Sequence, residues 1–505
     1  MKKNRILTLT IKLCLALVLA LGVVPGGNTH AAGVARPIQY DGQIRIPANA
    51  LNYYGASTVI SQYASGLLWK ANYVDGAFWT LPRPVDFDGA TTVELRLYFY
   101  PQTDTAGNVS FFIRPRAYNA GDAFGDATGQ DSVPVAVAGN TQIRMQAFSI
   151  PAATFGTKDL WAITIQRGGT GETYPDDVVL LAVELRYVRV SASTSQTALP
   201  ATGLNFDKTS TIITKFGSGL RWQADFGDTA YYAGPRPLDW NGSSDVELRL
   251  YFYPLTATAG KVDFFIRPRA YNPGDSFEDA NHVDGNAATV GQALQVRMES
   301  FSIPAATFGN KAEWMISLQR GGAAETYLND VVLMAVELRY THQAVIGKQG
   351  GQPANGINYD KYSTLLTQYY SGVRWQASYL NSAVYTVPRP IDWDGISDVE
   401  LRLYFYAVTA TSGKVSFFIR PRAFNVGDLG ADAPSMASSG VAVTAANEIR
   451  MQTFRIPADR FGTKALWMIT LQRGASDETY PDDVVLQSLE LRYNRYTLQL
   501  PLVKK

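Results

Sequence analysis

The chain has 505 residues, which at roughly 150 residues per domain suggests about three domains. Apolar residues make up 46% and charged residues 18% of the chain, so it can form hydrophobic cores, and a disordered, collagen-like or coiled-coil protein is excluded. Without four bases in a predicted leader, the 45 basic residues fall to 41 against 44 acidic ones. That balance does not favour nucleic acid as a partner.

The N-terminus, residues 1–31, has the pattern of a secretory signal peptide. A basic start precedes a twelve-residue apolar run, Leu13 to Val24, and small residues surround His30. The run is shorter than the about 20 residues of a transmembrane helix, and no other stretch approaches that length. We therefore expect a secreted or cell-surface protein without a transmembrane segment. The single cysteine, Cys14, lies in the leader, so disulfides and thiolate metal sites are excluded from the mature chain.

Three copies of one module follow the leader at a fixed offset of 153 residues. The segment Leu95 to Tyr100 returns at Leu248 to Tyr253 and at Leu401 to Tyr406, and Trp161 returns as Trp314 and Trp467. A period this long leaves room for a whole core in each copy and indicates tandem domains. The predicted segments are a signal peptide 1–31, an N-terminal strand or extension 32–50, modules 51–190, 204–343 and 357–496, linkers 191–203 and 344–356, and a tail 497–505.

Each module is predicted to consist of short antiparallel strands. Residues 93–100 alternate strictly, with valine, leucine and phenylalanine on one face and glutamate, arginine and tyrosine on the other. Segments 111–114, 142–150, 161–166 and 178–187 read similarly and are separated by glycine-containing turns. Tryptophans such as Trp69 lie among apolar residues and are expected in the core. The fold class is therefore all-β, with three tandem jelly-roll-like β-sandwiches.

The order of these motifs resembles the β-sandwich modules of bacteriophage tail, fibre and capsid-decoration proteins. In the second module the matching segments are Trp240 to Gly242, Asp245 to Tyr253, Arg269 to Asp275, Trp314 to Arg320 and Val336 to Tyr340. The resemblance implies a β-sandwich fold and a non-enzymatic role on a particle or surface. Modules of that kind typically trimerise, so we expect the three copies to pack with pseudo-threefold symmetry in one polypeptide.

Glutamate and arginine recur on the polar face of the central and closing strands. Antiparallel pairing of these strands predicts cross-strand ion pairs of Glu94 with Arg186 and of Arg96 with Glu184. A catalytic carboxyl needs a raised pKa, whereas a neighbouring arginine lowers it, so a structural charge ladder is the preferred interpretation.

Tyrosine and arginine form a second stripe on the same face, and Phe112 falls in the same register. Such a face can stack on and hydrogen-bond a sugar, or it can pack against the next module or another chain. A structural role predicts these side chains buried between modules, whereas sugar binding predicts them exposed. The candidate ligand-binding residues are Tyr98, Tyr100, Arg114, Arg116, Tyr251, Tyr253, Arg267, Arg269, Tyr404, Tyr406, Arg420 and Arg422.

Templates for cofactors, metals and catalysis are not met. The mature chain holds only His282 and His342, which are not equivalent positions, and neither a P-loop nor a dinucleotide motif occurs. Acidic loop residues fit turn capping better than calcium binding, which stays open. They are Asp86, Asp88, Asp122, Asp126, Asp176 and Asp177. We expect no cofactor and no metal.

These observations favour an exported, non-enzymatic structural, cell-surface or extracellular assembly protein, with itself, other surface proteins or polysaccharide as partners. Triplication suits avidity or assembly, because repeated weak contacts reinforce one another. The alternative is a multivalent carbohydrate-binding protein that uses the tyrosine and arginine face. A secreted glycosidase is the third possibility, because two well-placed carboxyls suffice for that chemistry.

Overall fold

The computed structural model describes residues 38–495 with short gaps. The gaps are 56, 64, 72–74, 126, 208, 225–226, 278–279, 344–346, 360–362, 364–365, 378–381 and 431. The predicted signal peptide 1–31 and the tail 497–505 lie outside the described residues. The described strands belong to one compact unit that begins at Tyr40. Within the described ranges, no helix is long and apolar enough to cross a bilayer.

Repeat 1 runs from β1 to β13. Its elements are β1 (Gly42–Pro47), η1 (Ala48–Ala50), β2 (Asn52–Tyr53), β3 (Ile60–Tyr63), β4 (Gly66–Trp69), β5 (Gly76–Pro82), β6 (Val93–Pro101), β7 (Gly107–Val109), β8 (Phe111–Tyr118), β9 (Gln130–Asp131), β10 (Val135–Val137), β11 (Arg144–Ile150), α2 (Ala152–Phe155), β12 (Leu160–Arg167) and β13 (Val178–Tyr187).

Repeats 2 and 3 follow the same order. Repeat 2 comprises β14 (Thr194–Pro200), η2 (Ala201–Gly203), β15 (Ile213–Phe216), β16 (Gly219–Trp222), β17 (Thr229–Pro235), β18 (Val246–Pro254), β19 (Gly260–Val262), β20 (Phe264–Tyr271), β21 (Val283–Asp284), β22 (Ala288–Val290), β23 (Arg297–Ile303), α3 (Ala305–Phe308), β24 (Glu313–Arg320) and β25 (Val331–Thr341). Repeat 3 comprises β26 (Gly347–Pro353), η3 (Ala354–Gly356), β27 (Leu366–Tyr369), β28 (Gly372–Trp375), β29 (Ser382–Pro388), β30 (Val399–Ala407), β31 (Gly413–Val415), β32 (Phe417–Phe424), β33 (Met436–Ala437), β34 (Val441–Val443), β35 (Ile449–Ile456), η4 (Ala458–Arg460), β36 (Leu466–Arg473) and β37 (Val484–Asn494).

Each repeat contributes a large sheet, a smaller sheet and a two-stranded ribbon. In repeat 1 the large sheet has the order β11-β6-β13-β4-β3, with β1 also paired to β13, and the smaller sheet has the order β2-β5-β12-β8-β9. The two sheets face each other across one hydrophobic core that contains Leu95 and Phe99 from β6 and Trp161 from β12. All nine tryptophans of the chain are fully buried, as expected for core residues.

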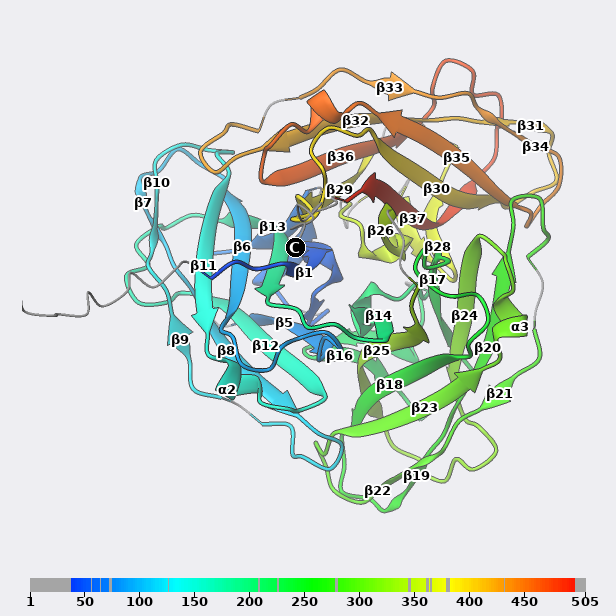
Figure 1. Cartoon of the computed structure of the whole chain (residues 1–505), viewed down its shortest axis with the longest axis horizontal. Helices are drawn as coiled ribbons and strands as arrows, with labels where there is room; N and C mark the ends of the chain where they lie inside the picture. Colours follow the sequence, from blue (N-terminus) through cyan, green and yellow to red (C-terminus); the bar gives the residue numbers. More distant parts are fainter. Residues whose placement is uncertain are drawn as a thin grey trace, which may run out of the picture. The chain divides into compact units, whose positions relative to one another are not determined.

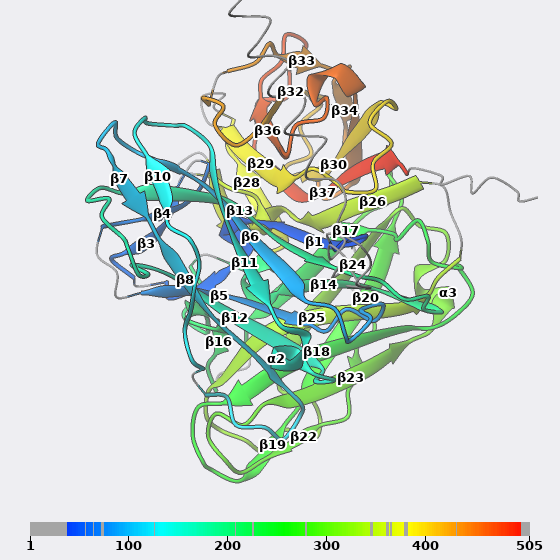
Figure 2. The same ribbon diagram turned by 60° about the vertical axis from the view of Figure 1, so that its left-hand side comes forward.

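The outer faces of the sheets are also buried, because successive repeats pack against each other. The smaller sheet of repeat 1 shares a hydrophobic cluster with the large sheet of repeat 2. The smaller sheet of repeat 2 does the same with repeat 3, and that of repeat 3 with repeat 1. The three repeats adjoin one another in both views, with β1, β14 and β26 near the centre (Figures 1 and 2).

The all-β prediction is therefore confirmed, but the description as three tandem β-sandwiches needs correction. Apolar clusters within repeats alternate with apolar clusters between repeats, so six larger sheets succeed one another in a closed series. This arrangement resembles the blades of a β-propeller. The sequence pattern left packing between repeats as one of two alternatives, because tyrosine on a strand's second face is compatible with both solvent and packing.

The predicted linkers 191–203 and 344–356 are also different from expectation. They contain β14 and β26, which pair with β25 and β37 as β1 pairs with β13. Pro47, Pro200 and Pro353 each precede a short 3-10 helix, with φ of −59°, −59° and −57°. Proline supplies this φ without strain, so these prolines start an element of the repeat.

Buried asparagines close the series of repeats. Asn52 Oδ1 of repeat 1 accepts a hydrogen bond from the backbone N of Thr202 in repeat 2 at 3.1 Å. Asn205 accepts from Asn355 N at 2.9 Å, and Asn358 accepts from Asn49 N at 3.2 Å. The bonds thus run from repeat 1 to 2, from 2 to 3 and from 3 back to 1. Each buried amide is satisfied only when the neighbouring repeat is in place.

Candidate functional site

The tyrosines of the predicted ligand-binding stripe lie between repeats. Tyr98 is 1% exposed, and its hydroxyl donates to Glu184 Oε2 at 2.7 Å. The hydroxyl of Tyr100 lies 2.9 Å from Ser65 Oγ. The equivalent pairs are Tyr251 with Glu337, Tyr253 with Ser218, Tyr404 with Glu490 and Tyr406 with Ser371. Burial, and then the Glu184 carboxylate, raise the pKa of Tyr98.

Of the two alternatives for the stripe, this position matches packing against the next repeat and not an exposed stacking face. The rings of Tyr98, Tyr251, Tyr253 and Tyr406 belong to the clusters between repeats. Phe124 of repeat 1 stacks on Tyr253 of repeat 2, with ring centroids 5.0 Å apart. A sugar could reach these tyrosine faces only if the repeats separated.

The inner arginines of the stripe share this environment. Arg116 is 8% exposed, lies over the ring of Phe124 at 5.1 Å and donates to Thr164 Oγ1 at 2.9 Å. Its equivalent Arg269 is also 8% exposed and lies over Phe277 at 4.7 Å. Arg422 is partly buried and pairs with Asp432 at 2.7 Å. These arginines therefore take part in the packing between repeats.

The outer arginines lie further along the same strands and remain partly exposed. Arg114 lies over the ring of Phe112 at 4.8 Å and donates to Gln166 Oε1 at 2.9 Å. Both Phe112 and Arg114 are half-buried. The same group recurs as Phe265, Arg267 and Gln319, and as Phe418, Arg420 and Gln472. We call these the three rim groups; each offers an aromatic ring, a guanidinium and an amide.

The predicted glutamate–arginine register is present, but the bonding differs. Glu94 lies opposite Arg186 and Arg96 opposite Glu184, as expected. In repeat 1 the ion pairs nevertheless form along each strand, from Arg96 to Glu94 at 2.9 Å and from Arg186 to Glu184 at 2.6 Å. In repeat 3 the predicted cross-strand pair is present as well, with Arg402 Nη1 3.9 Å from Glu490 Oε2. Glu184 is fully buried and also accepts a hydrogen bond from Gln43. In repeats 2 and 3, burial raises the pKa of Glu337 and Glu490 despite their arginine neighbours.

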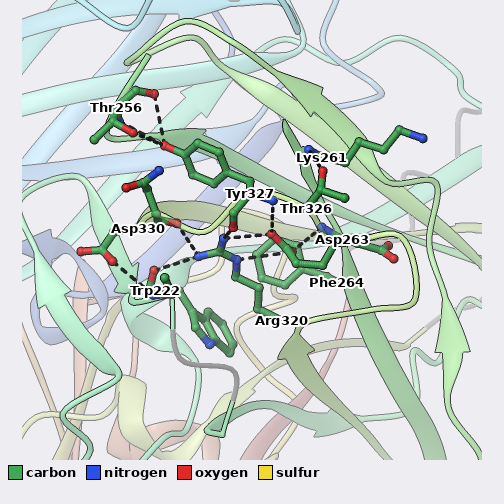
Figure 3. A network of polar contacts seen from close by, with 12 residues as sticks. Trp222, Thr256, Lys261, Asp263, Phe264, Arg320, Thr326, Tyr327 and Asp330 are labelled. Atoms are coloured by element: carbon green, nitrogen blue, oxygen red, sulfur yellow. Dashed lines mark hydrogen bonds and ion pairs between the residues drawn. The ribbon is translucent and has the colours of Figure 1, made fainter. Parts of the chain in front are cut away.

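A buried arginine organises the end of each smaller sheet, and sequence analysis gave it no role. Arg320 Nη1 donates to Asn329 O at 2.7 Å, and Nη2 donates to Glu325 Oε1 at 3.0 Å and to Tyr327 O (Figure 3). Arg167 forms the same three bonds, and Arg473 repeats those to the glutamate and to the tyrosine carbonyl; both arginines are also fully buried. The sequence does contain a signal for this buried arginine, because a single arginine ends the same apolar strand in each repeat, at intervals of 153 residues.

A polar pocket of about 260 Å³ lies where β1, β14 and β26 meet, and all three repeats line it. Asp86 Oδ1 accepts a hydrogen bond from the Tyr187 hydroxyl at 2.8 Å, and Oδ2 lies 3.2 Å from Arg189 Nε. Asp392 is held in the same way by Tyr493 and Arg495. Burial opposes ionisation of Asp392, but Arg45, Arg495 and Arg189 outweigh it and keep its pKa below the usual value.

Repeat 2 departs from this pattern around the pocket. His342 stands where the other repeats have arginine, and Asp239 instead lies 3.5 Å from Lys348 Nζ of β26. Arg45 of β1 donates to Pro388 O at 3.0 Å and lies over the ring of Tyr493. Each of the three aspartates around the pocket is thus paired with a cation.

The acidic loop residues cap turns and strand ends. Asp88 Oδ1 accepts from the backbone N of Ala90 and Thr91, each at 3.0 Å, and Asp177 Oδ1 accepts from Ala71 N at 3.0 Å. Asp176 accepts from two threonine hydroxyls, whereas Asp126 lies outside the described residues. Among the residues with a described position, no cluster of three or more acidic, histidine or cysteine side chains could hold a metal ion.

Comparison with known proteins gives no family. No protein-family model and no curated protein matches the chain. The solved structures that it resembles are jelly-roll or β-sandwich modules. A xylan-binding module CBM15 is 14% identical over 30% of this chain and 100% of its own, with a TM-score of 0.21. A tandem CBM22 pair from Paenibacillus barcinonensis is 11% identical over 59% of this chain and 93% of its own, with a TM-score of 0.21. A triple jelly roll protein of an archaeal virus is 9% identical over 91% of this chain and 97% of its own, with a TM-score of 0.17. At these TM-scores the similarities carry no argument about function.

Proposed function

We propose that the protein is an exported, non-enzymatic structural protein of the cell surface or the extracellular matrix. In this proposal its three jelly-roll-like repeats form within one chain the head that phage-type modules form as a trimer. The head presents three equivalent outer surfaces around one centre and would join other copies or other surface proteins.

The supporting observation is the position of the tyrosine faces. Faces that would join separate subunits are buried between repeats, and their hydroxyls are satisfied by glutamate and serine of the same repeat. The asparagine bonds close the same contacts in a ring. Most of the aromatic surface that could bind a sugar is therefore buried between repeats. A self-contained assembly unit requires this packing.

A co-sedimentation assay of residues 32–505 tests the proposal. We expect pelleting that depends on protein concentration and does not require added polymer. Electron microscopy of the dilute protein should show compact single heads. Pelleting only in the presence of insoluble cell-wall or plant-type polysaccharide would contradict the structural role.

Carbohydrate binding is the second candidate, and the three rim groups favour it. Each combines a half-buried phenylalanine with a guanidinium and an amide, a set that can stack on a sugar ring and bond its hydroxyls. The variant Phe112→Ala, Phe265→Ala, Phe418→Ala separates the candidates. Loss of polymer-dependent pelleting in this variant would assign the rim groups to glycan binding, and unchanged self-pelleting would support the structural role.

A further inference from the structure

A second pocket has a volume of about 260 Å³, and again all three repeats line it. Its lining includes Tyr53, Phe206 and Tyr359, which directly follow the buried asparagines that join the repeats. Three of its lining side chains occupy one equivalent position, Gln62, Lys215 and Gln368. Three more occupy another, Tyr53, Phe206 and Tyr359. The pocket lining therefore combines three aromatic side chains with three nitrogen donors, one from each repeat, and only one of these donors is charged.

The charged donor, Lys215, has no carboxylate partner among the described residues. Its Nζ donates to the hydroxyl of Tyr53 at 3.2 Å and lies 4.7 Å from the centre of that ring. Burial lowers its pKa to about 8. The other titratable side chains among the described lining residues are Tyr53 and Tyr359, and neither is an anion near neutral pH. A cation in this position is stabilised when an anion enters the pocket.

The neutral donors point to the same kind of ligand. The side-chain nitrogen of Gln368 is buried without a hydrogen-bond acceptor in the described part of the chain. That of Gln62, a residue only 9% exposed, lies beside the Tyr359 hydroxyl without a well-formed bond. Two amide donors and one ammonium group can satisfy an oxyanion, and buried donors without acceptors are rare in native proteins.

We propose that this pocket binds a small monocarboxylate, whose oxygens accept hydrogen bonds from Lys215 and from the amides of Gln62 and Gln368. A single cation balances one negative charge, which favours a carboxylate over a phosphate or a sulfate dianion. The walls formed by Ile60, Ile213 and the aromatic rings suit a short apolar or ring-shaped remainder. This role is independent of the proposed structural function.

The test is calorimetric titration of the full mature chain with sodium acetate, butyrate and glucuronate at constant ionic strength, with sodium sulfate as the competing anion. We expect saturable binding of at least one carboxylate. Lys215→Gln should weaken it at least about tenfold, because a charge-assisted bond is lost. Lys215→Arg should retain binding, and the affinity of the wild type should fall above about pH 8 as the lysine loses its proton.

Two features make the result decisive. Lys215→Gln gives repeat 2 the residue that repeats 1 and 3 already carry, so the variant should fold, and its melting temperature checks this. Lys414→Gln removes an exposed lysine of β31 and should bind as the wild type does. Equal affinity in wild type and Lys215→Gln, tighter binding of sulfate than of any carboxylate, or no carboxylate binding at all would overturn the proposal.

Discussion

Two contacts between repeats have the same geometry but opposite chemistry. Where repeat 1 meets repeat 2, Leu160 of β12 lies in an apolar cluster with Met334 and Ala335 of β25. Where repeat 2 meets repeat 3, the equivalent residues are Glu313, Gln487 and Ser488. Glu313 is fully buried and accepts a hydrogen bond from the Ser488 hydroxyl. The contact between repeats can therefore hold a buried carboxyl when the facing repeat supplies a hydrogen-bond donor.

The second contact is nevertheless incompletely satisfied. Glu313 Oε2 and both polar side-chain atoms of Gln487 have no hydrogen-bond partner in the described structure. Burial raises the pKa of Glu313 well above its usual value, and the nearby Glu490 adds to the effect. Because the pKa is raised in the folded state, the contact between repeats 2 and 3 is expected to weaken as pH rises towards that pKa.

The largest effect is expected when the acid is copied into the apolar contact. Leu160→Glu buries a carboxyl opposite Ala335, which cannot donate to it, and should lower the free energy of unfolding by about 3–5 kcal/mol at pH 7. Chemical denaturation measures this loss. Adding Ala335→Ser should restore part of it, because it recreates the pair of Glu313 and Ser488. If the double variant is no more stable than the single one, the serine does not compensate the acid.

The converse change should stabilise the protein. Glu313→Leu with Ser488→Ala gives two positions of the contact between repeats 2 and 3 the residues of the apolar contact and leaves Gln487 in place. We expect a gain of roughly 1–4 kcal/mol in the free energy of unfolding at pH 8. The pH dependence follows from the raised pKa of Glu313. The wild-type contact is fully stable below the pKa of the carboxyl in the unfolded chain, and it loses stability as pH rises towards the pKa in the folded protein. The double variant should therefore gain little free energy of unfolding over the wild type at pH 4 and much more at pH 8. A gain independent of pH would argue against a buried protonated acid.

A second acid distinguishes the interior of repeat 2. Glu299 occupies the position of Gln146 and Gln452, and its carboxylate oxygens accept from Phe264 N at 3.1 and 3.3 Å. In repeat 1, Gln146 both accepts from Phe111 N and donates to Phe111 O. Burial, and then the neighbouring Asp263 carboxyl, raise the pKa of Glu299 to about 9.

Glu299→Gln should restore the two-way bond of the other repeats and stabilise the protein by roughly 1–3 kcal/mol near pH 8. The raised pKa means that the wild type loses stability from about pH 4.5 up to about pH 9, so the gain should nearly vanish at pH 4. Thermal unfolding across this range measures the difference. The mirror variant Gln146→Glu should lose stability with the opposite pH trend, and its failure to do so would assign the effect to Asp263.

The sequence predicted the strands and their pairing register well. Strict alternation in 93–100 placed Leu95 inside the core, and the recurring charges placed Glu94 opposite Arg186. Both inferences depend on local periodicity, which one repeat contains by itself. Burial of the opposite face was one of two alternatives, because tyrosine and arginine suit both a solvated surface and a packed one.

The pockets could not be predicted for a related reason. Residues as distant as Arg45, Ser195 and Lys348 line the first pocket, and no local pattern joins them. The informative signal is the position at which one copy departs from the other two. Lys215, Glu299 and Glu313 are charged where the other repeats have glutamine or leucine. Alignment of the three copies therefore marks the unusual sites before their surroundings are known.

The smallest expected energy is the stacking contribution of the rings that join repeat 1 to repeat 2 and repeat 2 to repeat 3, counted apart from the apolar area that these rings bury. Phe124 stacks on Tyr253, Phe277 stacks on Tyr406, and the equivalent position facing Tyr100 is Gly430. Phe124→Ala should cost about 0.5–1.5 kcal/mol beyond the apolar area that it uncovers, and Phe277→Ala should cost a similar amount. Additivity in the double variant would indicate that the contacts between repeats act independently, because the two stacks share no residue. A double-variant loss clearly larger than the sum would instead show that opening one contact loosens the closed series as a whole.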